Sequence, residues 1–267
     1  MADESGENVD QGASHYAPGY AEARIGFMEK RRGVTHAAFL LPYLSDQSRV
    51  LDCGCGPGTI TNDLAACVKG GFVIGIDVNK AQTQRAQRHA RDLGIQNAFY
   101  IEQNVTALDF SDDSFDVVFS EALLDHVPDT EKAVSEMVRV LRPGGLLALR
   151  SPDWSGLAFD PPTESGLFLV EAYKNRIAAA GGHPFMGQQL SVCMGLAGLE
   201  NIKVSRGQEI HDAPSGFLLA IGEAVLPTSV NRNQANALIA EAQTWAKRPQ
   251  ATIREIWTEC VGFKRGS

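Results

Sequence analysis

Residues 50–61 constrain the fold of this chain more than any other stretch, and they read Val-Leu-Asp-Cys-Gly-Cys-Gly-Pro-Gly-Thr-Ile-Thr. An apolar run leads into Asp52, and glycines follow at alternate positions, Gly54, Gly56 and Gly58. Glycine reaches backbone dihedrals that are closed to other residues, and it lets a ligand lie directly against the main chain. A helix that starts just beyond such a turn points unpaired N–H groups at the ligand. The stretch therefore predicts a strand, a ligand-binding turn and the start of a helix.

The spacing of these glycines separates the turn from two better-known ligand-binding turns. The dinucleotide fingerprint would need glycine at the position of Thr59, and a phosphate loop would need a Gly-Lys-Ser/Thr ending that this stretch lacks. The observed Asp-x-Gly-x-Gly-x-Gly resembles motif I of the class I S-adenosylmethionine (SAM) methyltransferases. The exact motif, Leu-Asp-x-Gly-Cys-Gly-Pro-Gly, is most similar to that of the small-molecule branch, which includes the ubiquinone and menaquinone methyltransferases. A purely structural glycine-rich turn is the alternative interpretation.

The resemblance and the pattern of apolar runs and turns together predict an α/β fold. We expect a Rossmann-like, seven-stranded, mostly parallel sheet with an antiparallel last strand and helices on both faces. A helical N-terminal lid and C-terminal cap insertions should complete it. The expected strands are residues 49–52, 72–77, 98–101, 114–120, 146–150, 201–205 and 252–264. The expected helices are one or two within 21–44, then 60–69, 80–93, 130–141, 164–180, 186–197, 217–225 and 233–246.

The resemblance is specific over residues 50–150, where further family features follow in the family's order. Residues 120–129, at the end of the fourth strand, resemble the family's acidic residue and histidine followed by Pro-Asp. The Arg-Pro-Gly-Gly turn at 142–145 precedes the fifth strand, as in the family. We predict one domain with four parts, namely a disordered tail at 1–14, a helical lid at 15–48, a SAM-binding core at 49–150, and the rest of the sheet with substrate-cap insertions at 151–267.

Cofactor binding is expected at the carboxyl ends of the first four strands. Asp77 ends the second strand, where a parallel nucleotide-binding sheet places the carboxylate that accepts hydrogen bonds from ribose hydroxyls. Asp52 suits a cofactor that carries an ammonium and a sulfonium. Asn104 stands where the family usually has aspartate, and its amide oxygen can still accept a hydrogen bond from adenine. The predicted SAM-binding residues are Asp52, Gly54, Gly56, Gly58, Asp77, Val78, Asn104, Val105, Glu121 and Tyr20.

The resemblance implies methyl transfer from SAM, with S-adenosylhomocysteine (SAH) as the product, to an oxygen, nitrogen or carbon of a small aromatic or hydrophobic acceptor. The sulfonium departs as a neutral thioether, so the enzyme chiefly has to hold the nucleophile in line with the methyl group and exclude water. A general base would help a nucleophile that must lose a proton, and His126 is the leading candidate, followed by Glu121. Asp125, His183 and His211 come behind them. A structural histidine is the alternative interpretation of His126.

Segments on both sides of the core are expected to cover the site. Helices in the N-terminal position cover cofactor and substrate in the resembling family, so Tyr16, Tyr20 and Arg24 are lid candidates, with ordinary surface residues as the alternative. Residues 151–163 should form a turn-rich loop at the ligand-binding edge, and residues 206–249 a long insertion. Late aromatic residues could shape an acceptor pocket or belong to the core, and they are Trp154, Phe159, Phe168, Tyr173 and Phe185.

Composition and net charge limit the classes of partner that the chain is expected to bind. Its 267 residues are 44% hydrophobic and 21% charged, as in a globular domain, and the net charge of −8 gives no support for binding nucleic acid or anionic membranes. The most apolar late run, 216–227, is too short to span a bilayer. No basic-then-apolar signal segment opens the chain, so we expect a cytoplasmic protein without a membrane span or a nucleic-acid partner.

Cysteine usage agrees with a reducing compartment. The five cysteines are odd in number and mostly far apart, and Cys53 and Cys55 flank Gly54 with a spacing shorter than the usual metal-ligand spacing. We interpret both as small apolar fillers and expect no metal. The sequence leaves a homo-oligomer open. The rival function is a SAM-binding protein without methyl transfer, acting as a sensor, a partner subunit or a catalyst of other chemistry.

Overall fold

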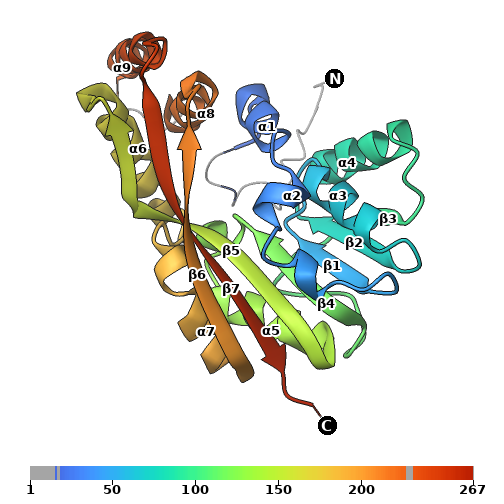
Figure 1. Cartoon of the computed structure of the whole chain (residues 1–267). Coiled ribbons are helices and arrows are strands. Elements are labelled where there is room, and N and C mark those ends of the chain that lie inside the picture. The colour runs from blue at the N-terminus through green and yellow to red at the C-terminus, as the bar shows by residue number, and fades with distance from the viewer. Residues whose placement is uncertain (1–15, 17–18, 227–230, 267) are drawn as a thin grey trace, which may run out of the picture.

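The computed structural model describes residues 16, 19–226 and 231–266, and these form a seven-stranded sheet with the strand order β3-β2-β1-β4-β5-β7-β6 (Figure 1). β1 to β5 pair in parallel, whereas β7 runs antiparallel to both of its neighbours, β5 and β6. The predicted fold class is confirmed. The strands are β1 (Arg49–Cys53), β2 (Phe72–Asp77), β3 (Ala98–Glu102), β4 (Phe115–Glu121), β5 (Leu141–Asp160), β6 (Leu199–His211) and β7 (Thr252–Lys264).

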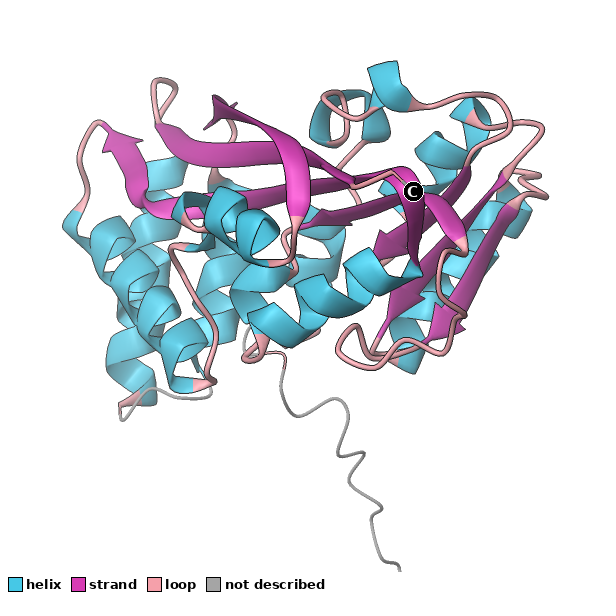
Figure 2. Cartoon of the chain, turned by 90° about the horizontal axis from the view of Figure 1, so that it is seen from below, coloured by secondary structure: helices cyan, strands magenta, loops and turns pink. Residues whose placement is uncertain are grey.

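Helices cover both faces of the sheet because successive strand residues point to opposite sides (Figure 2). Val50 belongs to a buried cluster with α3, whereas its neighbour Leu51 belongs to another cluster with α5 and α7. No helix in the described part of the chain is long and apolar enough to cross a membrane. The helices of the core are α3 (Thr59–Cys67), α4 (Lys80–Asp92), α5 (Thr130–Val140) and α7 (Leu190–Leu196), with the short 3-10 helices η3 (Leu124–His126) and η4 (Met186–Gln188).

A third buried cluster holds the late helices together at the far end of β5 and β7. It combines Trp154, Tyr173, Phe217 and Trp245 with apolar residues of α6 (Glu164–Ala179), α8 (Ser215–Val225) and α9 (Arg232–Ala246). In Figure 1 these three helices stand together beyond the sheet. We call this group the cap. It lies within residues 151–267, where cap insertions are predicted, and a role of these helices in substrate binding stays a prediction.

The N-terminal segment lies between the cap and the part of the sheet formed by β1 to β4 (Figure 1). It contains α1 (Glu22–Met28), α2 (Gly33–His36) and the 3-10 helix η2 (Leu41–Tyr43), consistent with the one or two helices predicted here. The ring of Phe27 meets Phe217 of α8 edge-on, with 5.6 Å between ring centroids. α1 thus forms a wall between the two parts of the molecule (Figure 1). The predicted disordered tail, residues 1–14, lies outside the described residues.

Two strands are longer than predicted, and both corrections have the same cause. The expected loop at 151–163 is wrong over most of its length, because β5 continues to Asp160 and pairs there with Thr252. Likewise, the insertion predicted from 206 begins later, because β6 continues to His211 opposite Ile253. β7 is long enough to give hydrogen-bond partners to both neighbours. The turn-forming residues of β5 lie at a register shift between Asp153 and Ala158, where the strand is irregular but does not end.

β5 also begins earlier than predicted, because Leu141 already pairs with Phe115 of β4, so the Arg-Pro-Gly-Gly turn predicted at 142–145 lies within the strand. The other predicted elements differ little from the structure. β2 and β7 have the predicted bounds, and the helices predicted at 80–93, 130–141 and 164–180 each end one residue earlier. The helix predicted at 186–197 is divided into η4 and α7. A Cβ on Gly187 would come within 2.9 Å of the Pro152 carbonyl oxygen, so η4 packs directly against the backbone of β5.

Candidate cofactor and acceptor site

The glycine-rich turn has the predicted strand, turn and helix, with φ values of 79° at Gly54, 51° at Gly56 and 81° at Gly58. Side chains rarely adopt these backbone conformations, which explains glycine at each position. Close packing adds a second reason. A Cβ would come within 2.6 Å of Met28 Cε at Gly56 and within 2.6 Å of Ala86 Cβ at Gly58. All three glycines therefore serve the turn, Gly58 also allows α3 to pack against α4, and Gly56 allows Met28 of α1 to approach.

Asp77 is fixed against this turn by the main chain. Its Oδ2 accepts a hydrogen bond from the Gly56 N–H at 3.0 Å, and its Oδ1 accepts one from the Asn79 N–H at 2.9 Å. Burial raises the pKa of Asp77, and the two N–H donors oppose that effect. The carboxylate lines a cavity and keeps lone pairs free for hydroxyl donors. This is the geometry expected of a ribose-binding acid at the tip of β2.

Asp52 is a buried acid at the end of β1, with only 3% of its surface exposed. Its Oδ2 accepts a hydrogen bond from Thr61 Oγ1 at 2.6 Å. Burial raises the pKa of Asp52 to about 7, the hydrogen bond from Thr61 opposes the rise, and the charges of Glu121 and Asp77 add to it. A cationic group in the cavity would favour the ionised form of Asp52.

The cavity has a volume of about 520 Å³, within the range of small-molecule and cofactor sites. It opens at the carboxyl ends of β1, β2 and β4, and α1 closes one side. The predicted residues that line it are Asp52, Gly54, Asp77, Val78, Asn104, Val105, Glu121, Tyr20 and His126, together with the lid candidates Tyr16 and Arg24. Gly56 and Gly58 shape the turn without belonging to the lining.

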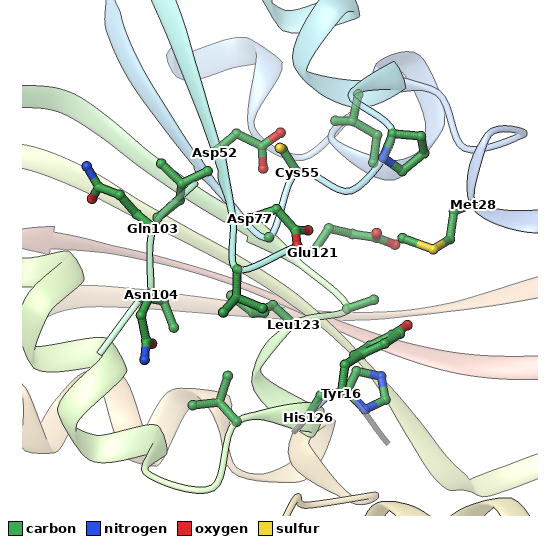
Figure 3. A pocket seen from close by; sticks show the side chains of 18 of the residues that line it. Tyr16, Met28, Asp52, Cys55, Asp77, Gln103, Asn104, Glu121, Leu123 and His126 are labelled. Carbon is green, nitrogen blue, oxygen red and sulfur yellow. The ribbon is translucent and has the colours of Figure 1, made fainter. Parts of the chain in front are cut away.

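Several lining residues are absent from the sequence prediction, among them Met28, Arg31, Cys55, Gln103 and Leu123. Met28 and Arg31 enter from the N-terminal segment, which carries no motif. Arg31 lies in the basic triplet at 30–32, a pattern typical of solvated surface. Cys55 is buried as predicted, but it also faces the cavity (Figure 3).

Glu121 is held between two arginines. Its Oε2 accepts a hydrogen bond from Arg31 at 2.8 Å, and its Oε1 accepts one from Arg150 at 2.8 Å. The guanidinium of Arg150 also stacks on Trp257, with Cζ 3.8 Å from the ring centroid. Both oxygens of Glu121 thus face positive charge. This arrangement favours a positioning role for Glu121 over that of a proton acceptor.

His126 lies in η3, just after β4, and its ring is buried beside Asp125 and Tyr16. Its Nε2 is 3.3 Å from Asp125 Oδ2, and the Tyr16 ring meets it edge-on at 4.8 Å between centroids. Burial lowers the pKa of His126 to about 4, Asp125 opposes that shift, and the arginines Arg24 and Arg31 add to it. The ring is therefore neutral at pH 7. Its Nδ1 is buried without a hydrogen-bond partner among the described residues, so one acceptor position of the neutral ring is unused there.

Asn104 lines the cavity at the position predicted to face adenine. Its Oδ1 accepts hydrogen bonds from the N–H and the hydroxyl of Thr106, at 3.0 and 2.9 Å. These contacts orient the amide at the start of the loop after β3. In Figure 3 Asn104 and Gln103 stand on one side of the cavity, and Tyr16 and His126 stand on another.

The remaining catalytic candidates lie outside the lining of this cavity. His183 Nε2 is 3.4 Å from the Pro128 carbonyl oxygen, and His211 Nε2 is 2.7 Å from Glu255 Oε2. The late aromatic residues do not form an acceptor pocket. Trp154, Phe159 and Tyr173 are buried in the cap core, and Phe168 and Phe185 are exposed on the surface.

One group of side chains in the described part of the chain lies close enough together to hold a metal ion, namely Glu209, His211 and Glu255, with ligand atoms within 4.8 Å of one another. Each of them already has a protein partner. His211 pairs with Glu255, and Glu209 Oε2 accepts a hydrogen bond from Arg150 at 3.1 Å. A network of ion pairs therefore accounts for this group.

The sequence profile of the methyltransferase-domain family matches residues 44–179, about half of the chain. The fold, the glycine-rich turn and the acid at the tip of β2 are those of a class I SAM-dependent methyltransferase. The chain belongs to this class and to the methyltransferase-domain family, and the predicted resemblance is confirmed.

Known proteins agree with this assignment. The chain is 37% identical over 146 residues to the probable methyltransferase ltbC of Aspergillus luteorubrus, and the match covers 51% of each chain. It is 38% identical over 115 residues to the ubiquinone/menaquinone biosynthesis C-methyltransferase UbiE of Vibrio vulnificus, over 42% of this chain and 44% of the other. The chain thus spans about half the length of these relatives.

Solved structures share the fold. A phosphoethanolamine N-methyltransferase from Haemonchus contortus, in complex with phosphomonomethylethanolamine and S-adenosylhomocysteine, superposes with a TM-score of 0.59 and 19% identity. The match covers 87% of this chain and 52% of that one.

Proposed function

We propose that this protein transfers a methyl group from SAM to an oxygen, nitrogen or carbon of a small-molecule acceptor. The observation that carries the proposal is the joint geometry of the glycine-rich turn and Asp77 at the edge of a 520 Å³ cavity. Membership of the methyltransferase-domain family supports the same reaction. SAM supplies a methyl group that is already activated, because the sulfonium leaves as a neutral thioether.

The residues of the cavity fit SAM. Asp77 would hold the ribose hydroxyls, and Val78, Asn104 and Val105 would surround the adenine. Asp52 would face the cationic part of the methionine, and its raised pKa agrees with a carboxylate that is short of positive partners. Gly54 would let the ligand approach the main chain. Tyr20, on the N-terminal segment, would close the site from the solvent side.

His126 is the residue that we propose to receive the acceptor's nucleophile. Its unpaired Nδ1 can accept a hydrogen bond from a hydroxyl or amine, while Asp125 lies next to Nε2 and favours a proton there. A group with a pKa of about 4 is a weak base. Its main contribution would therefore be to orient the nucleophile, and the buried lid would exclude water.

The cavity argues for a small acceptor, and the net charge of −8 argues against nucleic acid. A cytoplasmic location and the absence of a nucleic-acid partner stay predictions. The rival function, SAM binding without methyl transfer, would use the same SAM-binding residues but would need no acceptor in the cavity.

Calorimetric titration of the protein with SAM and SAH, with NADH as the control ligand, tests the proposal. We expect micromolar affinity for both SAM species and no binding of NADH. An Asp77→Ala variant should bind SAM about 10- to 100-fold more weakly, because hydrogen bonds from ribose to a carboxylate are lost. Asp92→Ala, an exposed acid at the end of α4, is the matched control and should bind normally. Failure of both SAM species to bind would overturn the proposal.

A screen of phenols, amines and quinone-like acceptors separates methyl transfer from the rival function. Acceptor-dependent production of SAH supports the proposed reaction. SAM binding with no SAH formed from any acceptor in the panel supports the rival.

A further inference from the structure

Arg24 is a buried cation that lines the cavity and has no acidic partner in the described part of the chain. Its side chain comes from α1, and only 6% of the residue is exposed. The Tyr16 hydroxyl accepts two long hydrogen bonds from it, at 3.3 and 3.4 Å, and its Cζ lies 5.7 Å from the centroid of the Tyr173 ring. The charge of Asp125 acts on it only from beyond ion-pair distance.

A buried guanidinium without a carboxylate costs several kcal/mol in a protein interior, and buried charges are normally paired. The other arginines around the cavity follow this rule. Arg31 pairs with Glu121 at 2.8 Å, and Arg150 pairs with Glu121 and Glu209. Arg24 is the exception within the described residues. Its planar fork of donors therefore suits an anion that arrives with a ligand.

Further unpaired polar atoms belong to the same region. Within the described residues, Asp125 Oδ1, His126 Nδ1 and the Tyr173 hydroxyl are all buried without hydrogen-bond partners. Tyr16 connects this group to Arg24, since its hydroxyl accepts the hydrogen bonds from Arg24 and its ring contacts His126. Arg24, Tyr16 and His126 line the cavity, whereas Asp125 and Tyr173 are not part of its lining.

These three lining residues lie at the end of the cavity away from the glycine-rich turn. In Figure 3, Tyr16 and His126 stand together, apart from Asp52 and Cys55. Arg24 also faces Tyr173 of α6 and so belongs to the side formed by the cap. The expected cofactor residues lie at the tips of β1, β2 and β3. A ligand held by Arg24 and His126 would therefore lie beyond the cofactor, where an acceptor must enter.

We propose that Arg24 binds an anionic group of the methyl acceptor, a carboxylate or a phosphate, while His126 receives the nucleophile on the same molecule. The inference rests on the proposed function, which places the cofactor near the glycine-rich turn and the acceptor beyond it. It names the substrate class as small anionic metabolites. The methionine carboxylate of SAM is the other source of the same chemistry, and the experiment distinguishes the two.

The test compares two probes of equal shape, 4-hydroxybenzoate and 4-hydroxybenzamide, by calorimetry with and without SAH. Wild-type protein should bind the carboxylate at least about tenfold more tightly than the amide. Arg24→Gln should reduce this preference to about twofold or less, and Arg24→Lys should retain part of it. Arg91→Gln, on the exposed face of α4, is the matched control and should keep the full preference. Phenyl phosphate against phenol repeats the comparison for a phosphate.

Two results would overturn the inference. One is the absence of any preference for the charged probes over the neutral ones in wild-type protein, or a preference that Arg24→Gln leaves unchanged. The other is an Arg24→Gln variant that binds SAH at least about tenfold more weakly but binds 5′-methylthioadenosine normally, because Arg24 would then hold the carboxylate of the cofactor. Circular dichroism and thermal unfolding show whether each variant is folded, and Arg24→Lys keeps the comparison open if Arg24→Gln is not. Failure of wild-type protein to bind SAH would overturn the proposed function, whereas the probe preference measured without SAH would still decide the role of Arg24.

Discussion

The raised pKa of Asp52 predicts that the affinity for SAM falls when the pH is lowered below neutral. Burial holds this pKa at about 7 in the free protein, so roughly half of the molecules carry a neutral Asp52 at pH 7. A ligand with an ammonium and a sulfonium binds the ionised form better, and binding therefore releases a proton. From about pH 7.5 to about pH 5.5 the ionised fraction of Asp52 falls about 25-fold, which sets the expected loss of affinity.

Calorimetry in buffers of different ionisation enthalpy measures both the affinity and the proton release. The ligand's own ammonium, an α-amino group with a pKa near 8, is mostly charged at pH 7.5 and fully charged at pH 5.5, so its titration changes the affinity far less than that of Asp52. 5′-Methylthioadenosine lacks both cationic groups, so its affinity should change little with pH. Asp52→Asn should bind SAM weakly at all pH values, without the pH dependence. SAM affinity that is constant from pH 7.5 to 5.5, or a slope that persists in Asp52→Asn, would refute the reasoning.

The same pKa shift makes an opposite prediction for stability without ligand. The folded state keeps a proton on Asp52 up to about pH 7, whereas the unfolded chain loses it near pH 4, so stability falls as the pH rises between these values. Relative to Asp52→Asn, the wild-type free energy of unfolding should drop by about 2–3 kcal/mol from pH 5 to pH 8. Urea unfolding at both pH values measures the difference. Equal pH profiles in the two proteins would contradict it.

Three further predictions concern packing, buried charge and catalysis. Gly58→Ala brings a Cβ within 2.6 Å of Ala86 Cβ at a φ of 81°. We therefore expect the free energy of unfolding, measured with urea, to fall by about 1–3 kcal/mol. An unchanged unfolding midpoint would contradict the close packing of α3 on α4. Arg150→Met leaves buried Glu121 with one guanidinium partner, so the free energy of unfolding should fall by about 3–5 kcal/mol; a loss below about 1 kcal/mol would show that this ion pair is dispensable. His126→Phe should slow methyl transfer to a hydroxyl acceptor by about 10²-fold, because the nucleophile is no longer oriented. Because the pKa of His126 is about 4, this residue should cause no inflection near pH 6.5 in the wild-type pH–rate profile. An inflection there that disappears in His126→Phe would show that the ring is not neutral at pH 7.

Local sequence predicted the residues of the proposed cofactor half of the site. The turn at 50–61 requires positive φ angles that few residues other than glycine adopt. The acid at the tip of β2 is predicted because it ends the second strand of a parallel sheet. Strand alternation and helix end signals similarly set most element bounds. The two large errors, in β5 and β6, arose where the partner strand β7 lies up to about a hundred residues away. Turn-forming residues then appeared to end strands that β7 in fact extends.

The residues of the proposed acceptor half of the site are brought together only by the tertiary structure. Arg31 meets Glu121 across 90 residues of sequence, and Arg150 joins them from another strand. Their pairing, and the missing partner of Arg24, depend on how α1 is held between the sheet and the cap. Burial then sets the charge state of His126 and of Asp52. The sequence by itself therefore determined the class of cofactor, because short-range backbone constraints encode it, whereas the electrostatics that would select an acceptor exist only once distant segments enclose the same cavity.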